Sequence, residues 1–393
     1  MIEAETAVIH GRVLYDVKLP IEWADGYYRT VVMPGFTDGH MHPQVIDPGV
    51  SVLSGFSDSY EWIENRIMAV DEGAVRRDES LSSRLTFLVL LRSVLEGTTL
   101  VSITGAFKPN VIAWSHMLEK PRTIFLPTTM RRQGWLLPQE IFELAEKLRN
   151  SINDSMARVG IFVHSIRYSS PGDLVYSYKV IENRKGIIGL HLSEGVSEID
   201  VLRGILGIER FNRIIAVHCI NDRVKHTGLS CISCPGTNAI LYGKVKRDIY
   251  DIDSFGSDWP HLIGTVGSHV HMIKRFFNVP IETLLFRLTT GGYIVHGMPS
   301  QGDLLGFDAS LDDLLHSSTA PVDVYVSGRK IVENKETVFS GFNISDIERE
   351  TLEAIKAAVD LHGTGLVSKK ELLSRLNLVR KGFYEANNSG IAS

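Results

Sequence analysis

Short apolar runs rich in valine, isoleucine and threonine recur along the chain and alternate with stretches of helical periodicity, such as 81–97 and 137–152. Strands that alternate with helices are typical of a parallel sheet, and eight such units close into a (β/α)8 barrel of roughly 250 residues. The eight apolar runs lie at 31–37, 98–104, 123–128, 159–163, 187–190, 213–217, 229–233 and 252–256. We therefore predict an α/β protein whose centre is a distorted TIM barrel over residues 34–297.

The two ends of this predicted barrel are flanked by segments with a strand pattern. Residues 7–16 and 27–33 near the start, and 321–333 near the end, have the alternation expected of strands that pair in one small sheet. We predict that residues 1–33 and 298–341 form an accessory β-sandwich-like domain built from both termini.

Residues 342–393 return to helical periodicity. Ser345 and Glu348 are three residues apart, as in a capping box, and precede an amphipathic stretch. This segment is predicted to be a C-terminal helical extension packed on the outside of the barrel.

Composition and charge narrow the class of protein. The chain of 393 residues is 44% hydrophobic and 22% charged, as ordinary globular proteins are, and its net charge of −5 offers no basic surface for nucleic acid or anionic lipid. The first residues do not have the pattern of a signal peptide, and no apolar run approaches the roughly 20 residues of a membrane span. Three cysteines are too few for a disulfide framework, so we predict a cytoplasmic protein.

Metal-ligating side chains follow several of the predicted strands. The carboxyl ends of barrel strands converge on one face, and in extended backbone residues i and i+2 project to the same side. Imidazole and carboxylate groups are the usual ligands of a divalent transition ion. The side chains concerned are His40, His42, His164, His191, His218 and Asp258. Their spacing predicts a metal site at the barrel mouth.

The segments around these residues carry a family resemblance. The chain resembles the amidohydrolase superfamily, and within it the cytosine deaminase-like branch that includes chlorohydrolases, guanine deaminases and methylthioadenosine/S-adenosylhomocysteine deaminases. The matching segments are PGFTDGHMHP after the first strand, VHSIRYSSP after the fourth, HLSEGVSE after the fifth, AVHC at the sixth, SCPGTN after the seventh and GSD at the eighth.

The resemblance implies a mononuclear site with one zinc ion, or alternatively iron, and a water molecule activated by it. Glu194 would shuttle protons and His218 would orient the water and stabilise developing charge, with Asp258 as the third catalytic residue. A second ion is not expected, because His164 stands where binuclear members have a bridging carboxylate. The implied ligands are His40, His42, His191 and Asp258.

Substrate contacts are predicted from the same resemblance and from arginines near the barrel mouth. His164 matches a substrate-contacting histidine of the deaminases. Arg131 and Arg132 could bind a carboxylate or ribose hydroxyls, or form a solvated rim. Arg167 occupies a place that is usually aromatic in the family, which indicates a remodelled pocket that Arg167 helps to line. Three aromatic side chains could stack on a planar ring: Tyr60, Trp62 and Trp135.

Two further patterns are interpreted as structural. Cys231 and Cys234 have the spacing of a zinc knuckle, but on a strand they face opposite sides, so core packing is the better interpretation. His269 and His271 lie in a stretch with helical pattern, where positions i and i+2 point apart and cannot share an ion. We expect both histidines on a helix surface.

These observations predict a metal-dependent hydrolase that releases ammonia from an aminated heterocycle such as a purine or pyrimidine. Hydrolysis of a cyclic or linear amide is the alternative, because the same residues would serve it. A barrel that keeps its metal but acts only as a binding protein is a third hypothesis. The expected partner is a small-molecule substrate, without nucleic acid or membrane, and the resemblance implies a homodimer.

Overall fold

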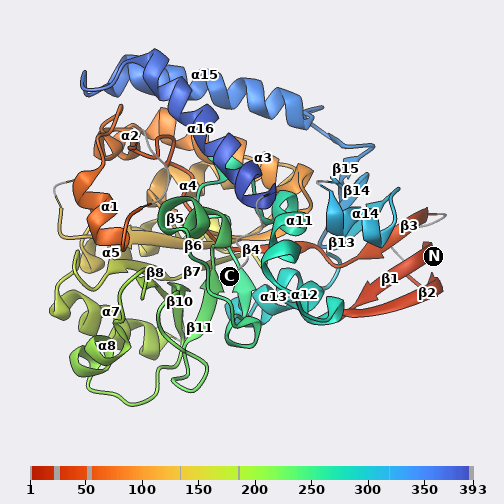
Figure 1. The fold of residues 1–393 in the computed structure, drawn as a ribbon, viewed down its shortest axis with the longest axis horizontal. Coiled ribbons are helices and arrows are strands. Elements are labelled where there is room, and N and C mark those ends of the chain that lie inside the picture. Colours follow the sequence, from red (N-terminus) through yellow and green to blue (C-terminus); the bar gives the residue numbers. More distant parts are fainter. Residues whose placement is uncertain are drawn as a thin grey trace.

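The computed structural model contains two sheets and describes residues 2–21, 27–50, 55–132, 134–184, 186–317 and 319–388. Figure 1 shows the larger sheet curled into a barrel and the smaller sheet beside it, next to the N-terminus. Within the described ranges, no helix combines the length and the apolarity needed to cross a bilayer.

Eight parallel strands make the barrel, and each pairs with its neighbour in the order of the sequence. The ring closes where Met41 bridges Asp258, so the first strand meets the eighth. The strands are β4 (Phe36–Met41), β5 (Thr98–Gly105), β6 (Arg122–Thr129), β8 (Ile161–Ser165), β9 (Ile188–Leu192), β10 (Ile214–His218), β11 (Ser230–Ser233) and β12 (Ser254–Phe255), while β7 (Ala157–Val159) pairs with β6 outside the ring. The predicted (β/α)8 barrel is confirmed.

The start of the first barrel strand differs from the prediction. The apolar run 31–37 was expected to be one strand, but β3 (Tyr27–Met33) belongs to the small sheet and β4 begins only at Phe36. Pro34 lies between them and cannot donate to a ladder. A Cβ on Gly35 would lie 1.7 Å from Thr99 Oγ1, so the chain crosses between the two sheets where only glycine fits.

Helices surround the barrel and connect its successive strands. The predicted helix at 81–97 is α3, and the predicted helix at 137–152 is interrupted at Leu148 into α5 and α6. The helices are α1 (Ser59–Asn65), α2 (Glu72–Arg77), α3 (Glu79–Leu95), α4 (Phe107–Ser115), α5 (Pro138–Lys147), α6 (Arg149–Ile152), α7 (Pro171–Arg184), α8 (Ile199–Leu206), α9 (Pro235–Tyr242), α10 (Pro260–Ile263), α11 (Val266–Phe276), α12 (Ile281–Leu288) and α13 (Thr290–His296).

Helix α11 corrects the expectation for His269 and His271. Both histidines are buried, not on a helix surface. Helix α11 packs between the barrel and the C-terminal extension: the ring of Phe383 lies 4.8 Å from that of His269, whose Nε2 is 2.9 Å from the carbonyl oxygen of Ile263. The extension supplies a cover that the helical pattern alone does not reveal.

The small sheet joins the two termini, as predicted. Strand β13 pairs antiparallel with β3 and so connects the late strands to the early ones. The result is one seven-stranded sheet in the order β16-β15-β14-β13-β3-β1-β2. Its remaining strands are β1 (Ile2–Ile9), β2 (Arg12–Leu19), β13 (Leu304–Phe307), β14 (Asp323–Val326), β15 (Arg329–Glu333) and β16 (Glu336–Thr337), with α14 (Leu311–His316) between β13 and β14.

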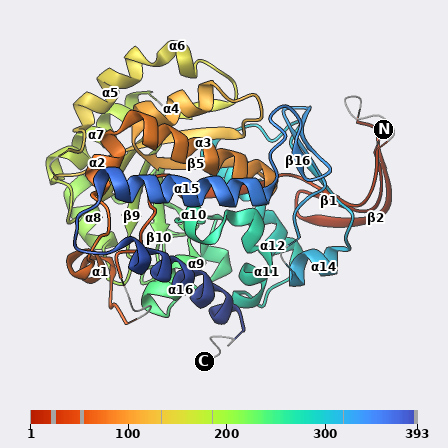
Figure 2. The same ribbon diagram turned by 90° about the horizontal axis from the view of Figure 1, so that it is seen from above.

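The C-terminal extension consists of α15 (Ile344–His362) and α16 (Lys369–Asn388), which lie across the outside of the barrel (Figure 2). The first helix starts two residues earlier than the Ser345–Glu348 pattern predicted. Asn343 is the N-cap, and its side chain accepts from the backbone N–H groups of Ser345 and Asp346. Asp346 completes the capping box, because asparagine caps as well as serine does.

Helix α16 holds the long loop that follows β4. Arg375 is buried, its Nη1 donates to the carbonyl oxygen of Ile67 at 2.6 Å, and it lies 3.8 Å from the buried carboxylate of Asp47. Asp47 in turn accepts from the backbone N–H groups of Gly49 and Ala69 at 2.8 and 2.6 Å. The C-terminal extension therefore fixes a loop that borders the barrel mouth.

Replacing Arg375 with alanine is expected to lower the free energy of unfolding by about 2–3 kcal/mol, because it leaves a buried carboxylate without its cation. Asp47 keeps its two backbone donors, which limits the loss. Denaturant unfolding measures the effect. The matched control is Arg349→Ala, which removes an arginine that is 64% exposed from α15 and should change stability by less than about 0.5 kcal/mol. Equal stability of the two variants would contradict the role given to Arg375.

Candidate metal centre and cavity

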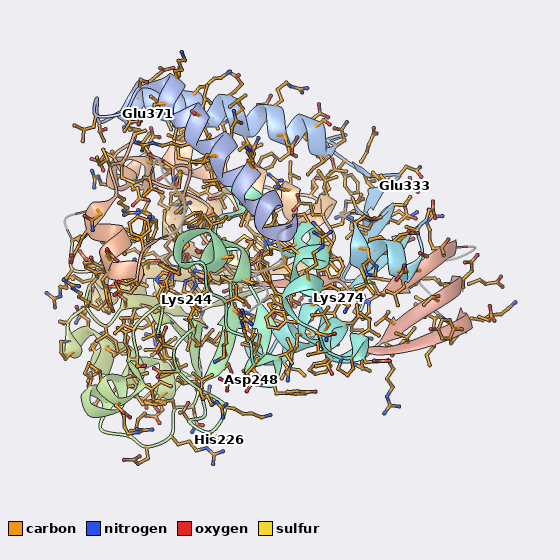
Figure 3. The ribbon with its side chains drawn as sticks, in the orientation of Figure 1. His226, Lys244, Asp248, Lys274, Glu333 and Glu371 are labelled. Atoms are coloured by element: carbon orange, nitrogen blue, oxygen red, sulfur yellow. The ribbon has the colours of Figure 1, made fainter. Side chains whose placement is uncertain are left out.

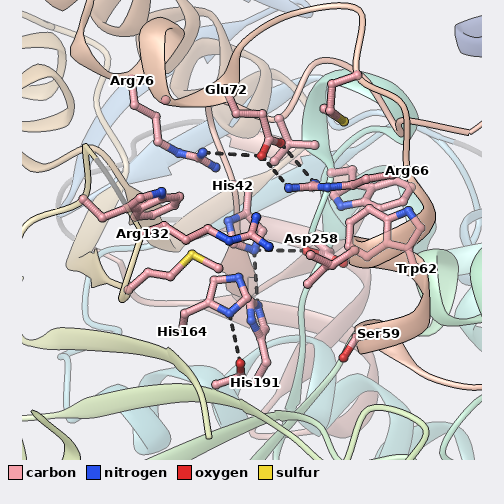
Figure 4. Close-up of a pocket in the computed structure, with 18 of the residues that line it drawn as sticks. His42, Ser59, Trp62, Arg66, Glu72, Arg76, Arg132, His164, His191 and Asp258 are labelled. Atoms are coloured by element: carbon pink, nitrogen blue, oxygen red, sulfur yellow. Dashed lines mark hydrogen bonds and ion pairs between the residues drawn. The ribbon is translucent and has the colours of Figure 1, made fainter. Parts of the chain in front are cut away.

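Three histidines and one aspartate meet at the carboxyl ends of β4, β9 and β12. The Nε2 atoms of His40, His42 and His191 lie 3.0, 3.3 and 3.2 Å from one another. Asp258 Oδ1 lies 3.6 Å from His40 Nε2 and 3.4 Å from His42 Nε2. Figure 4 shows His42, His191 and Asp258 converging on the wall of a cavity.

Backbone geometry at the closure of the barrel brings these side chains together. The N–H of His42 donates to the carbonyl oxygen of Asp258 at 2.8 Å, and the N–H of Asp258 donates to that of His40 at 2.9 Å. A Cβ on Gly256 would lie 2.8 Å from the carbonyl oxygen of His40, so glycine permits this close approach. Asp258 has a φ of 66° and His218 a φ of 76°. Left-handed backbone in non-glycine residues is uncommon, and it turns both side chains inward here.

The donor set fits one divalent ion. Zn–N bonds of about 2.0–2.1 Å in a tetrahedral site place ligand atoms about 3.3 Å apart, close to the observed imidazole spacing. Burial lowers the pKa values of His42 and His191 well below the ordinary value, which keeps the rings neutral as ligands require. Burial opposes ionisation of Asp258, but His40 and the other nearby histidines outweigh it and hold the pKa of that carboxyl below its usual range.

Neighbouring hydroxyl groups orient two of these side chains. Thr104 Oγ1 lies 2.8 Å from His42 Nδ1, which leaves Nε2 facing the site. Thr237 Oγ1 donates to Asp258 Oδ2 at 2.7 Å, so Oδ1 points toward the histidines. Such contacts fix the orientation of metal ligands in metalloproteins. His218 lies close enough to His40 and His191 to join the group as a further nitrogen donor.

Glu194 lies beside this group in the turn after β9. It is buried, Tyr242 donates its hydroxyl to Oε1 at 2.7 Å, and Oε1 is 3.5 Å from His218 Nε2. Burial, together with the negative charge of Asp258, raises the pKa of Glu194 to about 8. The carboxyl can therefore hold a proton near neutral pH, as a proton shuttle needs.

Asn238 is a site residue whose role sequence reasoning missed, although it stands inside the SCPGTN segment. Its Oδ1 lies 2.8 Å from His218 Nδ1 at the start of α9. Burial lowers the pKa of His218 to about 4, so the ring is neutral and, with Nδ1–H donated to Asn238, presents Nε2 as an acceptor. Asn238 thus determines which nitrogen faces the site.

Replacing Asn238 with alanine is expected to lower kcat by about 10- to 100-fold while metal content stays the same, because it releases the His218 ring. Steady-state rates beside elemental analysis of the purified variant measure both. Asn238→Asp, which keeps an acceptor for Nδ1–H, should retain more of kcat than the alanine variant. Equal kcat in the alanine variant and the wild type would show that His218 needs no such partner.

The cavity above the site has a volume of about 760 Å³. His42, His164, His191, His218, Glu194 and Asp258 all line it. Burial, with Arg66 and Arg76 nearby, lowers the pKa of His164 to about 3, so this ring is neutral and can donate or accept toward a ligand. Trp62 and Trp135 line the cavity too, whereas Tyr60 lies outside it and donates its hydroxyl to Glu198.

Two of the three arginines predicted to contact substrate, Arg131 and Arg167, lie outside the cavity. Arg131 is half-exposed and donates to both carboxylate oxygens of Asp173 at 2.6 and 2.9 Å. Arg167 pairs with Glu64 at 2.6 Å, and both side chains are half-exposed. The cavity lining contains neither of them but does contain Arg132. The cysteines are buried with free thiols, and the metal-type groupings found among the described residues do not include them.

Comparisons with known proteins support the fold. No family model matches the sequence, and no curated protein matches it either. Solved structures that are similar include an adenosine deaminase from Xanthomonas campestris with bound zinc (TM-score 0.73, 17% identity, 91% of this chain and 98% of that chain). Also similar is an amidohydrolase from Brucella melitensis (TM-score 0.68, 16% identity, 91% of this chain and 99% of that chain). A third is a zinc-complexed atrazine chlorohydrolase from Arthrobacter aurescens TC1 (TM-score 0.66, 15% identity, 90% of this chain and 100% of that chain). The chain therefore has the fold of these hydrolases, as its motifs predicted.

Proposed function

We propose that this chain, which has the fold of zinc-containing deaminases and chlorohydrolases, is a metal-dependent hydrolase that releases ammonia from an aminated heterocycle. One observation carries the proposal. Three imidazole Nε2 atoms and a carboxylate converge at the spacing of a single ion, beside a buried Glu194, on the wall of a cavity of about 760 Å³. Each element of hydrolytic C–N chemistry thus has a residue in place.

The ligands of the proposed ion are His40, His42, His191 and Asp258, with His218 near enough to assist. A divalent ion held there would act as a Lewis acid that lowers the pKa of a water molecule toward neutrality; zinc suits this nitrogen and oxygen donor set, and iron is the alternative.

Protein side chains would handle the protons and the substrate. Glu194 takes a proton from the attacking water and delivers it to the ring nitrogen or the leaving amine, so its carboxyl alternates between the two protonation states that its raised pKa makes accessible. His218 Nε2, as acceptor, orients the water. His164, neutral and facing the cavity, contacts the substrate ring.

Elemental analysis of the purified protein, together with an assay of ammonia release from aminated purines, pyrimidines and triazines, tests the proposal. We expect about one zinc or iron ion per chain and ammonia from at least one compound. Metal without ammonia would move the assignment to hydrolysis of a cyclic or linear amide. A protein that holds no metal would overturn the four-ligand site.

The remaining expectations about partners belong to the same proposal. The substrate is a small molecule, in keeping with the volume of the cavity. A cytoplasmic setting is supported by the three free cysteines. The charge balance supports the proposal that neither nucleic acid nor a membrane is a partner, and a homodimer stays a prediction to be tested by light scattering.

A further inference from the structure

The outer wall of the cavity contains a cluster of buried charges that the proposed chemistry does not use. Lys244 and Glu371, which are labelled in Figure 3, are examples of charged side chains that are exposed. Between β4 and α3, by contrast, Arg66 at the end of α1 and Glu72 in α2 are only 14% and 13% exposed, and Arg76 in α2 is 10% exposed. Figure 4 shows Glu72 between the two arginines, across the cavity from His191.

The positive charge in this cluster exceeds the negative charge. Glu72 is bound to Arg66 at 2.7 Å, and its other cation, Arg76, is 3.6 Å away. Burial would raise the pKa of Glu72, but the two arginines outweigh it and hold that pKa below the ordinary value, so the carboxyl is anionic. One carboxylate therefore faces two guanidinium groups inside the protein. Further out, Asp71 and Arg77 offset each other at the exposed rim.

Arg76 is the group without a counter-charge of its own. Its Nε and Nη1 atoms are buried and have no hydrogen-bond partner among the described residues. The guanidinium stacks on Trp135, 4.2 Å from the ring centroid, which fixes its plane while Nε and Nη1 make no hydrogen bond within the described residues. A buried donor without an acceptor lowers the stability of the fold by about 1–3 kcal/mol, and by more when the donor is charged. An anionic ligand that accepts from Arg76 would remove this cost.

Other arginines in the cavity lining also favour an anionic ligand. Arg132 lines the same cavity, and its guanidinium lies 4.8 Å from the ring of Tyr168, with no carboxylate within ion-pair distance among the described residues. Arg66 lies over Trp62 as Arg76 lies over Trp135. Planar aromatic surfaces and guanidinium forks thus alternate along the wall opposite the metal-type residues. This wall suits a flat ring that carries an acidic substituent.

We propose, building on the deaminase function above, that the substrate is an aminated heterocycle with an anionic substituent, a carboxylate or a phosphate, and that Arg76 binds this group at the outer wall. The amine end then lies at His191 and Glu194 while the acidic end lies at Arg76, with Arg66 and Arg132 as auxiliary cations. Arg76 is a specificity-determining residue: it selects acidic over neutral members of the same ring class.

Calorimetric titration of the metal-loaded protein with benzoate, phenylphosphonate and benzyl alcohol tests the anion site without any chemical step. We expect both acids to bind and the alcohol not to, and the stronger of the two acids identifies carboxylate or phosphate as the natural group. Arg76→Met should weaken the acids by about 10- to 100-fold, the loss of one charge-assisted contact, and Arg76→Lys by less. Arg184→Met, which removes an exposed cation paired with Glu146 on the outside, should bind them as the wild type does.

The Glu72→Gln variant distinguishes loss of the anion site from misfolding of the protein. It removes the carboxylate that competes for the two arginines, so it should tighten binding of the acids by about 5-fold or more, a gain that a damaged protein cannot show. Binding of the acids that is unchanged in Arg76→Met would place them on the metal or elsewhere and overturn the proposal. Equal binding of benzyl alcohol and benzoate, or no binding of either acid, would overturn it as well.

A second assay separates this inference from the proposed function. Ammonia release is compared within two pairs, 2-aminopyrimidine with its 5-carboxylate and adenosine with adenosine 5′-monophosphate. Higher kcat/KM for an acidic member, lost in Arg76→Met, supports both proposals. Acid binding that depends on Arg76 without ammonia from any compound leaves the anion site standing and counts against the deaminase function alone.

Discussion

Replacing Glu194 with glutamine is expected to lower kcat by about 10³-fold or more while the metal content of the protein stays the same. The substitution keeps the size of the side chain and a carbonyl oxygen to accept from Tyr242, so the local packing should persist. Steady-state ammonia release and elemental analysis, on the same preparation, measure the two quantities.

The control is Glu209→Gln, a carboxylate that is 91% exposed and should leave kcat unchanged. If the Glu194 variant keeps more than about a tenth of the wild-type kcat, proton transfer by this residue is not needed and the mechanism is wrong. If it loses its metal together with its activity, Glu194 is a ligand and not a shuttle. The same variant distinguishes an enzyme from a protein that only binds its ligand, because only an enzyme has a kcat that the substitution can lower.

Removal of the metal is expected to abolish activity and to lower the unfolding temperature. The Nε2 atoms of three imidazoles lie 3.0–3.3 Å apart, so one ion bound between them would be coordinated by all three rings. Binding to the folded state alone stabilises by about 4 kcal/mol when free zinc is about 1,000 times its Kd. Thermal unfolding with chelator, and again after zinc is restored, measures this contribution.

His191→Ala tests the same site by substitution. The variant should hold far less metal, lack activity, and unfold at a temperature that zinc no longer raises. His226→Ala removes an exposed histidine from a loop (Figure 3) and should respond to zinc as the wild type does. A chelator that leaves the unfolding temperature and the activity of the wild type unchanged would refute the metal site, whatever the fold.

The eight barrel strands could be located from the sequence because strands of a closed parallel barrel are buried on both faces. Their apolar runs are therefore continuous, and β5 and β6, for example, are buried along their whole length. The candidate ligands could be found for a related reason. Carboxyl ends of barrel strands converge whatever the loops do, so a polar residue directly after an apolar run is placed by the strand itself.

In the C-terminal extension and at the first barrel strand, the local sequence pattern was not sufficient to predict the boundaries of the elements or their burial. Asn343 and not Ser345 caps α15, because Phe342 donates its N–H to Thr337 of β16 and this turn places Asn343 directly before the helix. The apolar run around Pro34 serves two sheets in succession, and only their packing separates it into β3 and β4. His269 is buried because α16 covers α11 from far along the chain.

The long arginine side chains show the same limit at the cavity. Arg131 and Arg132 are adjacent in the sequence, yet Asp173 draws Arg131 away while Arg132 lines the cavity. Glu64 likewise holds Arg167 outside, whereas Arg76 of α2 lines the cavity. By itself the sequence determined the barrel and the positions of the candidate histidine and aspartate ligands and of Glu194, because these residues lie at or just after strand ends. Only the tertiary structure decided which arginines line the cavity, because a flexible side chain points to whichever partner the distant parts of the chain bring near.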